Sequence, residues 1–350
     1  MDKIQRILTD AVNDGIICGG AVLAGNCDKD CLNLGVGYTS PNSKYNMDAN
    51  TVLDVASTTK VAAVITALLI CHNRGLIDFD APFTEYLPGF TAVSDLYETI
   101  TVRDLANHLS GFGDVRGQKQ RLYFDESGTK MLSNILVTPP PHPPTRHAVY
   151  SCWNYLLLSS ILEQITGEKL PDFCRKEIFA PLTMNSTSMG KPLPEIPLER
   201  LGQTMGTTQP GEISDFVAMR IYRDGGSAGN AGLFTSAKDF SKLLQCYLRG
   251  GCSPEGKVLF SKMEIREISP DQKIHFNGYR KFGWVIYENF LAEEMFGSVL
   301  FHSGWSGQTI LFDLSRNFYA VVLTTRCGDY DRAKKDRFDI LYEIWKMAER

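Results

Sequence analysis

The chain has 350 residues, of which 43% are hydrophobic and 22% are charged, and its net charge at pH 7 is −4. A chain of this length can bury a large core and form two lobes. No basic run and no interleaving of aromatic with basic residues occurs, so nucleic-acid binding has no support. The apolar run Val61–Cys71 has 11 residues and is too short to span a membrane.

The first ten residues are typical of an amphipathic helix and lack the apolar region of a signal peptide. We therefore expect a cytoplasmic protein, unless a leader has been removed. The 9 cysteines are scattered without a C-x-x-C pair, which favours a reducing compartment over a disulfide framework or a zinc site. The 6 histidines are dispersed and form no H-E-x-x-H motif, so the sequence predicts neither a metal nor another cofactor. The oligomeric state is left open.

In chain order, the first helix is followed by two short strands at Gly20–Ala24 and Cys31–Gly37. A buried helix is expected over Val61–Cys71, ending near Gly75. Further helices are expected at 101–108 with a capping box, at 153–167, at 172–179, at 237–248 with a serine N-cap, and at 336–348. The stretch 190–215 is expected to have no regular structure.

Four apolar runs with short turns between them predict an antiparallel meander near the C-terminus; they lie at 282–287, 298–301, 309–312 and 318–324. Strands at both ends of the chain with helices between them predict an α/β (α+β) fold. We expect a discontinuous sheet lobe formed by 1–75 and 225–350, with a mostly helical lobe, 76–224, inserted into it. An active site is expected between the two lobes.

One candidate catalytic site is Ser57-x-x-Lys60 at the start of the buried helix. At a helix N-terminus, free N–H groups and the positive end of the dipole favour a developing negative charge. Lys60 lies one turn after Ser57 on the same face. An apolar setting lowers the pKa of a lysine, so Lys60 is a candidate for activating Ser57 as a nucleophile.

A rival nucleophile is Ser227, because Gly225–Gly229 satisfies G-x-S-x-G, the nucleophile elbow of α/β-hydrolases. That motif requires a strand before it and a helix directly after it. His275 or His302 would supply the base. A flexible glycine loop is the alternative reading of this segment.

Two further segments complete a second pattern, Tyr150-Ser151-Cys152 before a helix and His302-Ser303-Gly304-Trp305 at the end of an apolar run. Together with Ser57-x-x-Lys60, these motifs and the segments around them, in this order, resemble the serine β-lactamase and penicillin-binding protein superfamily, in its class C and DD-peptidase-like branch. The resemblance covers roughly residues 15 to 325. It implies a β-lactamase-like fold, an antiparallel sheet flanked by helices with an inserted helical lobe.

The resemblance also implies roles for individual residues. Ser57 would attack the acyl carbon, and Lys60 with Tyr150 would form the general base network, either one being the base. Tyr150 would pass a proton to the leaving group. The backbone N–H groups of Ser57 and Trp305 would form the oxyanion hole. His302, Ser303 and Gly304 belong to the strand that flanks the site.

Two departures from the family pattern bear on the substrate. The family's second motif is usually Tyr-x-Asn, whose amide holds an amide of the substrate, but Cys152 occupies that place and is a poor hydrogen-bonding group. Asn154 comes two residues later and would fall on a different helix face. The third motif has His302 where typical β-lactamases have lysine. Both changes argue against efficient β-lactam hydrolysis.

The sequence therefore predicts a serine hydrolase or acyl transferase that forms an acyl-enzyme on Ser57, with a small-molecule ester or D-amino-acid amide as substrate. Ester hydrolysis is the first choice. The alternative is a penicillin-binding DD-peptidase, a D-aminopeptidase or a weak β-lactamase, with a β-lactam as ligand. A non-catalytic binding protein on the same fold is the alternative of another class, but Ser57, Lys60 and Tyr150 are all present.

Overall fold

The computed structural model describes residues 2–88, 94–113, 138–144, 147–269 and 280–348. Its main sheet has seven strands in the order β2-β1-β10-β9-β8-β7-β6, and all neighbours are antiparallel. The strands are β1 (Ile17–Gly25), β2 (Asp30–Gly37), β6 (Arg280–Lys281), β7 (Trp284–Val285), β8 (Val299–Gly304), β9 (Gln308–Asp313) and β10 (Phe318–Arg326). Because β1 pairs with β10, both ends of the chain form one sheet, which confirms the prediction.

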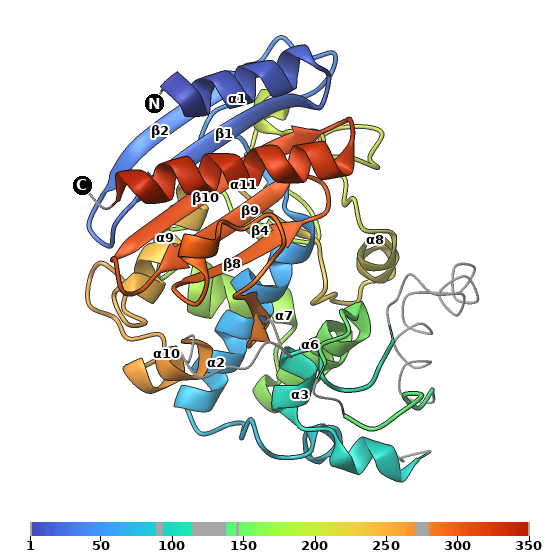
Figure 1. The fold of residues 1–350 in the computed structure, drawn as a ribbon. Helices are drawn as coiled ribbons and strands as arrows, with labels where there is room; N and C mark the ends of the chain where they lie inside the picture. Colours follow the sequence, from blue (N-terminus) through green and yellow to red (C-terminus); the bar gives the residue numbers. More distant parts are fainter. Residues whose placement is uncertain (1, 89–93, 114–137, 145–146, 270–279, 349–350) are drawn as a thin grey trace.

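Helices cover both faces of this sheet (Figure 1). On one face lie α1 (Asp2–Asn13) and α11 (Tyr330–Met347), side by side, and on the other lies α9 (Ala237–Leu248). Successive side chains of a strand point to opposite faces, so Val22 of β1 packs in the α1–α11 core and Leu23 in the larger core on the α9 side. All nine residues of β10 are buried between these layers.

Most of the other described helices gather below the sheet in the view of Figure 1, and α8 lies to the right of it. They are α2 (Thr66–Asn73), α3 (Val102–Ala106), α6 (Cys152–Thr166), α7 (Leu170–Cys174), α8 (Phe216–Arg223) and α10 (Lys262–Ile268). Several caps follow the sequence. Thr101 and Asp104 form the predicted capping box of α3, Ser236 caps α9, and Gly75 and Gly167 end α2 and α6 in the left-handed conformation.

The structure differs from the sequence predictions in several places. The apolar run 282–287 is not one strand, because Phe282 and Gly283 have positive φ and form the turn between β6 and β7. Helices α8 and α10 were not predicted. A second sheet of three short strands, β3 (Leu53–Asp54), β5 (Leu233–Thr235) and β4 (Ser188–Met189), was not anticipated. The closing helix α11 begins at Tyr330, six residues before the predicted start, because the Asp329 side chain accepts a hydrogen bond from Arg332 N and caps it.

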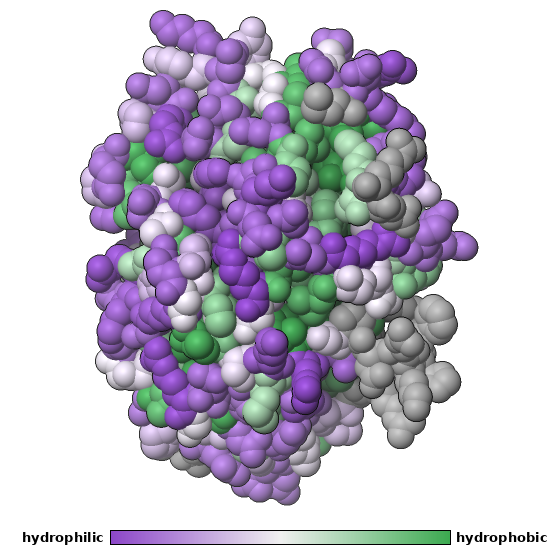
Figure 2. All heavy atoms as spheres, turned by 90° about the vertical axis from the view of Figure 1, so that its left-hand side faces the viewer, coloured by the Kyte–Doolittle hydropathy of each residue, from purple (hydrophilic) through white to green (hydrophobic). Residues whose placement is uncertain are grey.

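The face turned to the viewer in Figure 2 is covered mostly by hydrophilic side chains, and hydrophobic ones show between them in separate patches. Among the described helices, none combines the length and the apolar character needed to cross a membrane. The boundaries of the two lobes, 1–75 with 225–350 and 76–224, stay a prediction.

Candidate active site

Ser57 lies in a turn that connects the small sheet to the buried helix. The residues Ala56–Thr58 form a 3₁₀ turn, and a π-helical stretch, Lys60–Ile65, leads into α2. Ala56 has φ = 46°, a left-handed conformation that is costly for a residue with a side chain. Its N–H donates to the Asp54 carboxylate, at 3.2 Å. Backbone strain and π-helical turns are both concentrated at functional sites, and here they stand on either side of one serine.

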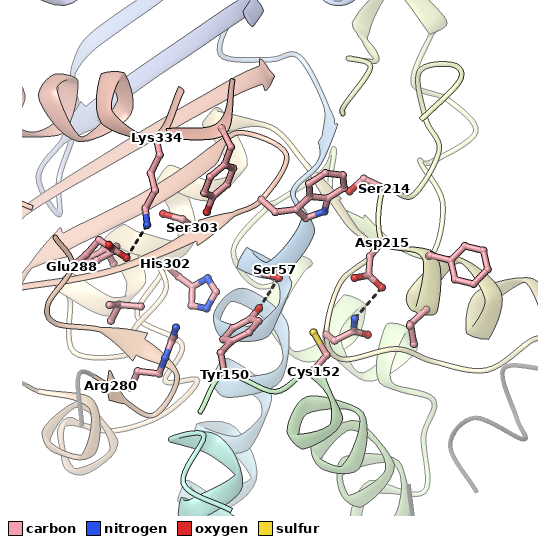
Figure 3. Close-up of a pocket in the computed structure, with 17 residues that line it drawn as sticks. Ser57, Tyr150, Cys152, Ser214, Asp215, Arg280, Glu288, His302, Ser303 and Lys334 are labelled. Carbon is pink, nitrogen blue, oxygen red and sulfur yellow. Dashed lines mark hydrogen bonds and ion pairs between the residues drawn. The ribbon is translucent and has the colours of Figure 1, made fainter. Parts of the chain in front are cut away.

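Two donors converge on the Ser57 hydroxyl oxygen. Lys60 Nζ donates to Oγ at 3.1 Å. Tyr150 OH donates to it at 2.8 Å (Figure 3). Lys60 is fully buried and its ammonium also donates to the backbone carbonyl of Asn230, at 2.8 Å. The ammonium further lies 4.9 Å from the centroid of the Tyr150 ring. Serine, lysine and tyrosine thus form one connected hydrogen-bonded group.

The protonation of this group differs from the sequence expectation. Burial alone would lower the pKa of Lys60, but its electrostatic interactions with Cys152, Tyr150 and Asp215 and its hydrogen bond with Tyr150 outweigh burial and raise that pKa. Burial raises the pKa of Tyr150, and the Lys60 ammonium offsets only part of this effect. The expected lowering of the Lys60 pKa is therefore wrong. In the resting site Lys60 is an ammonium and Tyr150 a neutral phenol.

His108, a residue that the motifs did not indicate, packs against the Tyr150 ring. The buried His108 ring lies 4.7 Å from the Tyr150 ring, centroid to centroid, and its Nδ1 accepts a hydrogen bond from Ser151 N at 3.0 Å. Burial and nearby positive charges hold the pKa of His108 well below its usual value. A neutral imidazole can accept this bond, so His108 fixes the turn that carries Tyr150.

His302 lies on β8 and faces the same space as Tyr150 (Figure 3). It is 2% exposed, and neither ring nitrogen has a hydrogen-bond partner among the described residues. Burial and the positive charges of Arg280 and Lys60 hold the pKa of His302 well below its usual value. The imidazole is therefore neutral, and it forms part of the cleft wall. It does not provide the charge that a lysine would provide at this position.

The rest of the third motif follows along β8. Ser303 Oγ shares a hydrogen bond with Thr309 Oγ1 at 3.0 Å, and Trp305, the first residue after the strand, is exposed at the rim. Gly304 lies against the nucleophile turn, because an added Cβ there would stand 2.8 Å from the backbone oxygen of Val55. Only glycine lets this strand approach the Ser57 segment so closely.

Cys152 and Asn154 occupy different surroundings at the start of α6. Cys152 is 7% exposed, lies beside Lys60 and Asn230, and has a pKa raised by burial, so its thiol is protonated. Asn154 is fully buried and bonds to Ser110 Oγ at 2.7 Å and His108 Nδ1 at 3.3 Å. Its amide is therefore committed to the protein interior and does not replace the amide that the second motif lacks.

A family model described as Beta-lactamase matches residues 4–343. The chain belongs to the β-lactamase family. Among the similar proteins is a Bacillus subtilis N-acetylmuramyl-L-alanine amidase, 28% identical over 80% of this chain and 69% of its own length. The membership confirms the resemblance inferred from the motifs and the expectation of a serine hydrolase.

Solved structures show the same fold. One is EstCE1, a hydrolase with promiscuous acyltransferase activity, with a TM-score of 0.75 at 19% identity, covering 97% of this chain and 98% of that one. Another is the D-amino acid amidase from Ochrobactrum anthropi, with a TM-score of 0.73 at 21% identity, covering 99% of this chain and 98% of that one. The predicted β-lactamase-like architecture is confirmed.

A cleft of about 460 Å³ collects most of the residues singled out by the β-lactamase motifs. Of the predicted site residues, those on its wall are Ser57, Tyr150, Cys152, His302, Ser303 and Trp305. Lys60 and Gly304 lie directly behind the wall. Sequence reasoning missed Arg280, Asp215 and Asn230, which also line it. Asn230 begins a segment, 230–237, that contributes to the family resemblance, but no role was assigned to it. Arg280 and Asp215 come from segments without a recognisable motif, so only the fold brings them to the site.

The rival nucleophile is wrong. Ser227 lies in a loop that follows helix α8 and not a strand, and the next helix, α9, begins only at Ala237. Ser227 is 6% exposed and is not part of the cleft wall. Of its two candidate bases, His275 lies outside the described residues and His302 faces the cleft of Ser57. The glycine-loop reading of 225–229 is therefore the correct one.

Proposed function

We propose that Ser57 is the nucleophile of this serine hydrolase and that the enzyme forms an acyl-enzyme from an ester or a D-amino-acid amide. The proposal rests on one observation, the convergence of Lys60 Nζ and Tyr150 OH on Ser57 Oγ in the wall of the cleft. Once either of these two titratable groups is deprotonated, it is within hydrogen-bonding distance to accept the Ser57 proton. Ester hydrolysis is the preferred reaction.

In the proposed reaction one member of the Lys60–Tyr150 pair first loses a proton to solvent. Ser57 Oγ then bonds to the acyl carbon, and the Ser57 proton passes to the deprotonated member of the pair. The tetrahedral oxyanion is stabilised by the backbone N–H groups of Ser57 and Trp305. Tyr150 then gives a proton to the leaving alcohol or amine as its bond to the acyl carbon breaks. Water, activated by the same pair, releases the acid and restores Ser57. The site residues and their roles are proposals.

A penicillin-binding peptidase or weak β-lactamase is the second candidate, and Arg280 favours it. Its guanidinium lines the cleft, 5.2 Å from the centroid of the Tyr150 ring, and donates to the Gly283 carbonyl at 3.0 Å. The remaining guanidinium donors suit the carboxylate of a peptide or of a β-lactam. Neutral His302 adds hydrogen-bonding capacity without charge.

The decisive experiment is covalent labelling followed by intact-mass and peptide-mass analysis. A fluorophosphonate should label Ser57, and Ser57→Ala should lose both the label and ester turnover. Ser227→Ala is the matched control and should retain both. A label on Ser227, or ester turnover that survives Ser57→Ala, would overturn the proposal. Stable acylation by penicillin of the same serine would favour the second candidate over a simple esterase.

A further inference from the structure

The cleft is polar at both ends, and the two ends differ in charge. Arg280 and His302 lie on one side of Ser57, and Asp215 lies on the other side (Figure 3). Asn230 also lines the cleft and donates a hydrogen bond to Asp215. Tyr150, the proposed proton donor to the leaving group, has the Arg280 guanidinium over its ring. The leaving group therefore belongs on the Arg280 side, and the acyl group of the substrate belongs on the Asp215 side.

The acyl side contains a buried acceptor that the protein leaves unsatisfied. Asn230 is fully buried; its backbone oxygen accepts from Lys60, and its side-chain Nδ2 donates to Asp215 Oδ1 at 3.1 Å. Its side-chain Oδ1 has no hydrogen-bond partner in the described part of the chain. Buried polar atoms are nearly always paired, and an unpaired one carries a desolvation cost. Since Asn230 lines the cleft, a ligand can supply the missing donor.

Asp215 lies beside this unpaired acceptor and adds a carboxyl group to the same end of the cleft. Its Oδ1 accepts from Ala218 N at 2.8 Å and from Asn230, which holds the carboxylate at the mouth of the cleft. Behind it lies the buried carboxyl of Asp54, which accepts from Ser214 N and whose pKa is raised to about 6 by burial, with Asp215 contributing. The nearest cation at this end is Lys60, which interacts with Asp215, and its ammonium is already bonded to Ser57 and Asn230.

We infer that this end of the cleft binds a protonated amine on the acyl part of the substrate. The inference rests on the proposed function and deepens it: the substrates are aminoacyl esters or amides with a free amino group. The ammonium donates to Asn230 Oδ1 and to the Asp215 carboxylate, while the acyl carbon lies at Ser57. An ammonium satisfies the buried acceptor and the charge together, which an uncharged acyl chain cannot do.

Protection of Ser57 from fluorophosphonate labelling tests this without requiring turnover. Alaninamide, in both enantiomers, is compared at pH 7 with isobutyramide, in which a methyl group replaces the ammonium. A charge-assisted hydrogen bond contributes enough for about a tenfold or greater difference in affinity. One alaninamide enantiomer should thus halve the labelling rate at a concentration at least about tenfold below that of isobutyramide.

Asp215→Asn removes the charge but keeps an acceptor for Ala218 N and Asn230, so the cap of α8 is preserved. In this variant the advantage of alaninamide should fall to about twofold or less. The matched control is Glu212→Gln, a carboxylate three residues earlier that bonds to Thr208 and is not part of the cleft wall; it should keep the full difference. Melting temperatures identify a variant that fails to fold. In that case the comparison of alaninamide with isobutyramide on the wild-type enzyme alone tests the inference.

The outcomes separate the two proposals. If the fluorophosphonate labels Ser57 but alaninamide and isobutyramide protect it equally, or neither protects it, the amine site is overturned. The proposal that Ser57 is the nucleophile is then unaffected. A charge preference that survives in Asp215→Asn places the amine elsewhere and also overturns the inference. Absence of any fluorophosphonate label on Ser57 overturns the proposed function itself.

Discussion

Gly304→Ala tests the close contact between strand β8 and the nucleophile turn. An added Cβ would lie 2.8 Å from the Val55 backbone oxygen, 3.3 Å from Ala56 Cβ and 2.5 Å from Gln308 Oε1. The amide end of Gln308 can swing aside at the cost of the hydrogen bond that it accepts from Ser306 Oγ. Val55 cannot move alone, because its backbone leads within two residues into Ser57. The strand and the turn must therefore separate.

The size of the separation follows from the geometry. Restoring an ordinary contact means lengthening the distance to the Val55 oxygen from 2.8 Å to about 3.4 Å, a shift of about 0.6 Å. The two segments that separate carry the N–H groups of the proposed oxyanion hole, on Ser57 and Trp305. Loss of one such donor costs about 10²- to 10³-fold in kcat, and a displacement of about 1 Å costs about 10²-fold. We expect kcat to fall about 10- to 100-fold, with KM changed little.

The assay is the hydrolysis of a simple ester by the purified variant, with kcat and KM measured separately and folding checked by thermal unfolding. Gly113→Ala is the matched control, since an added Cβ there meets no atom of the described residues within 4 Å. Its kcat should equal that of the wild type. If a folded Gly304→Ala enzyme keeps kcat within about twofold of the wild type, the oxyanion hole does not lie between Ser57 and Trp305.

Three further outcomes are expected. Lys60→Ala combined with Tyr150→Phe should lose little more activity than the worse single variant, because groups that act as a unit are not additive; multiplying losses would contradict this. Cys152→Asn should raise the rate of acylation by penicillin or a D-alanyl peptide, relative to a simple ester, about two- to tenfold, and an unchanged ratio of the two rates would refute it. The pKa of Asp54 is raised from 3.8 to about 6, so its ionisation costs stability as pH rises through that interval. Between pH 4 and 7 the free energy of unfolding of the wild type, measured by urea unfolding, should fall by about 3 kcal/mol through this group, and that of Asp54→Asn should not. Parallel pH profiles of the two proteins would contradict this.

The sheet could be predicted from the sequence because its strands carry strong local signals. The apolar runs that became β8, β9 and β10 are bounded by short turns, and a meander is the simplest way to pair them. The small sheet could not be predicted in this way. Its strands have two or three residues each, which is too short for an alternating pattern, and they pair only because distant segments meet beside Ser57.

Only those residues of the proposed site that belong to a sequence motif could be predicted from the sequence. Ser57 and Lys60 lie one turn apart in sequence, so their contact follows from local geometry. Asp215 and Arg280 reach the cleft through tertiary structure alone. The direction of the Lys60 pKa was also beyond the sequence, because apolar neighbours in the chain indicate burial but not the thiol and phenol that approach the ammonium in space.

Cys152 shows how a departure from a motif acquires a physical meaning once the fold is known. The sequence indicates only that an amide is missing from the second motif. In the structure the thiol lies against the side-chain amide of Asn230, whose Oδ1 has no partner in the described part of the chain. A longer, amide-bearing side chain at 152 would bring N–H donors toward that oxygen, whereas a protonated thiol is a weak donor. Cysteine therefore keeps the acceptor available for a ligand. By this reasoning Cys152→Asn should also weaken the protection of Ser57 by alaninamide, because the variant would satisfy Asn230 from within the protein.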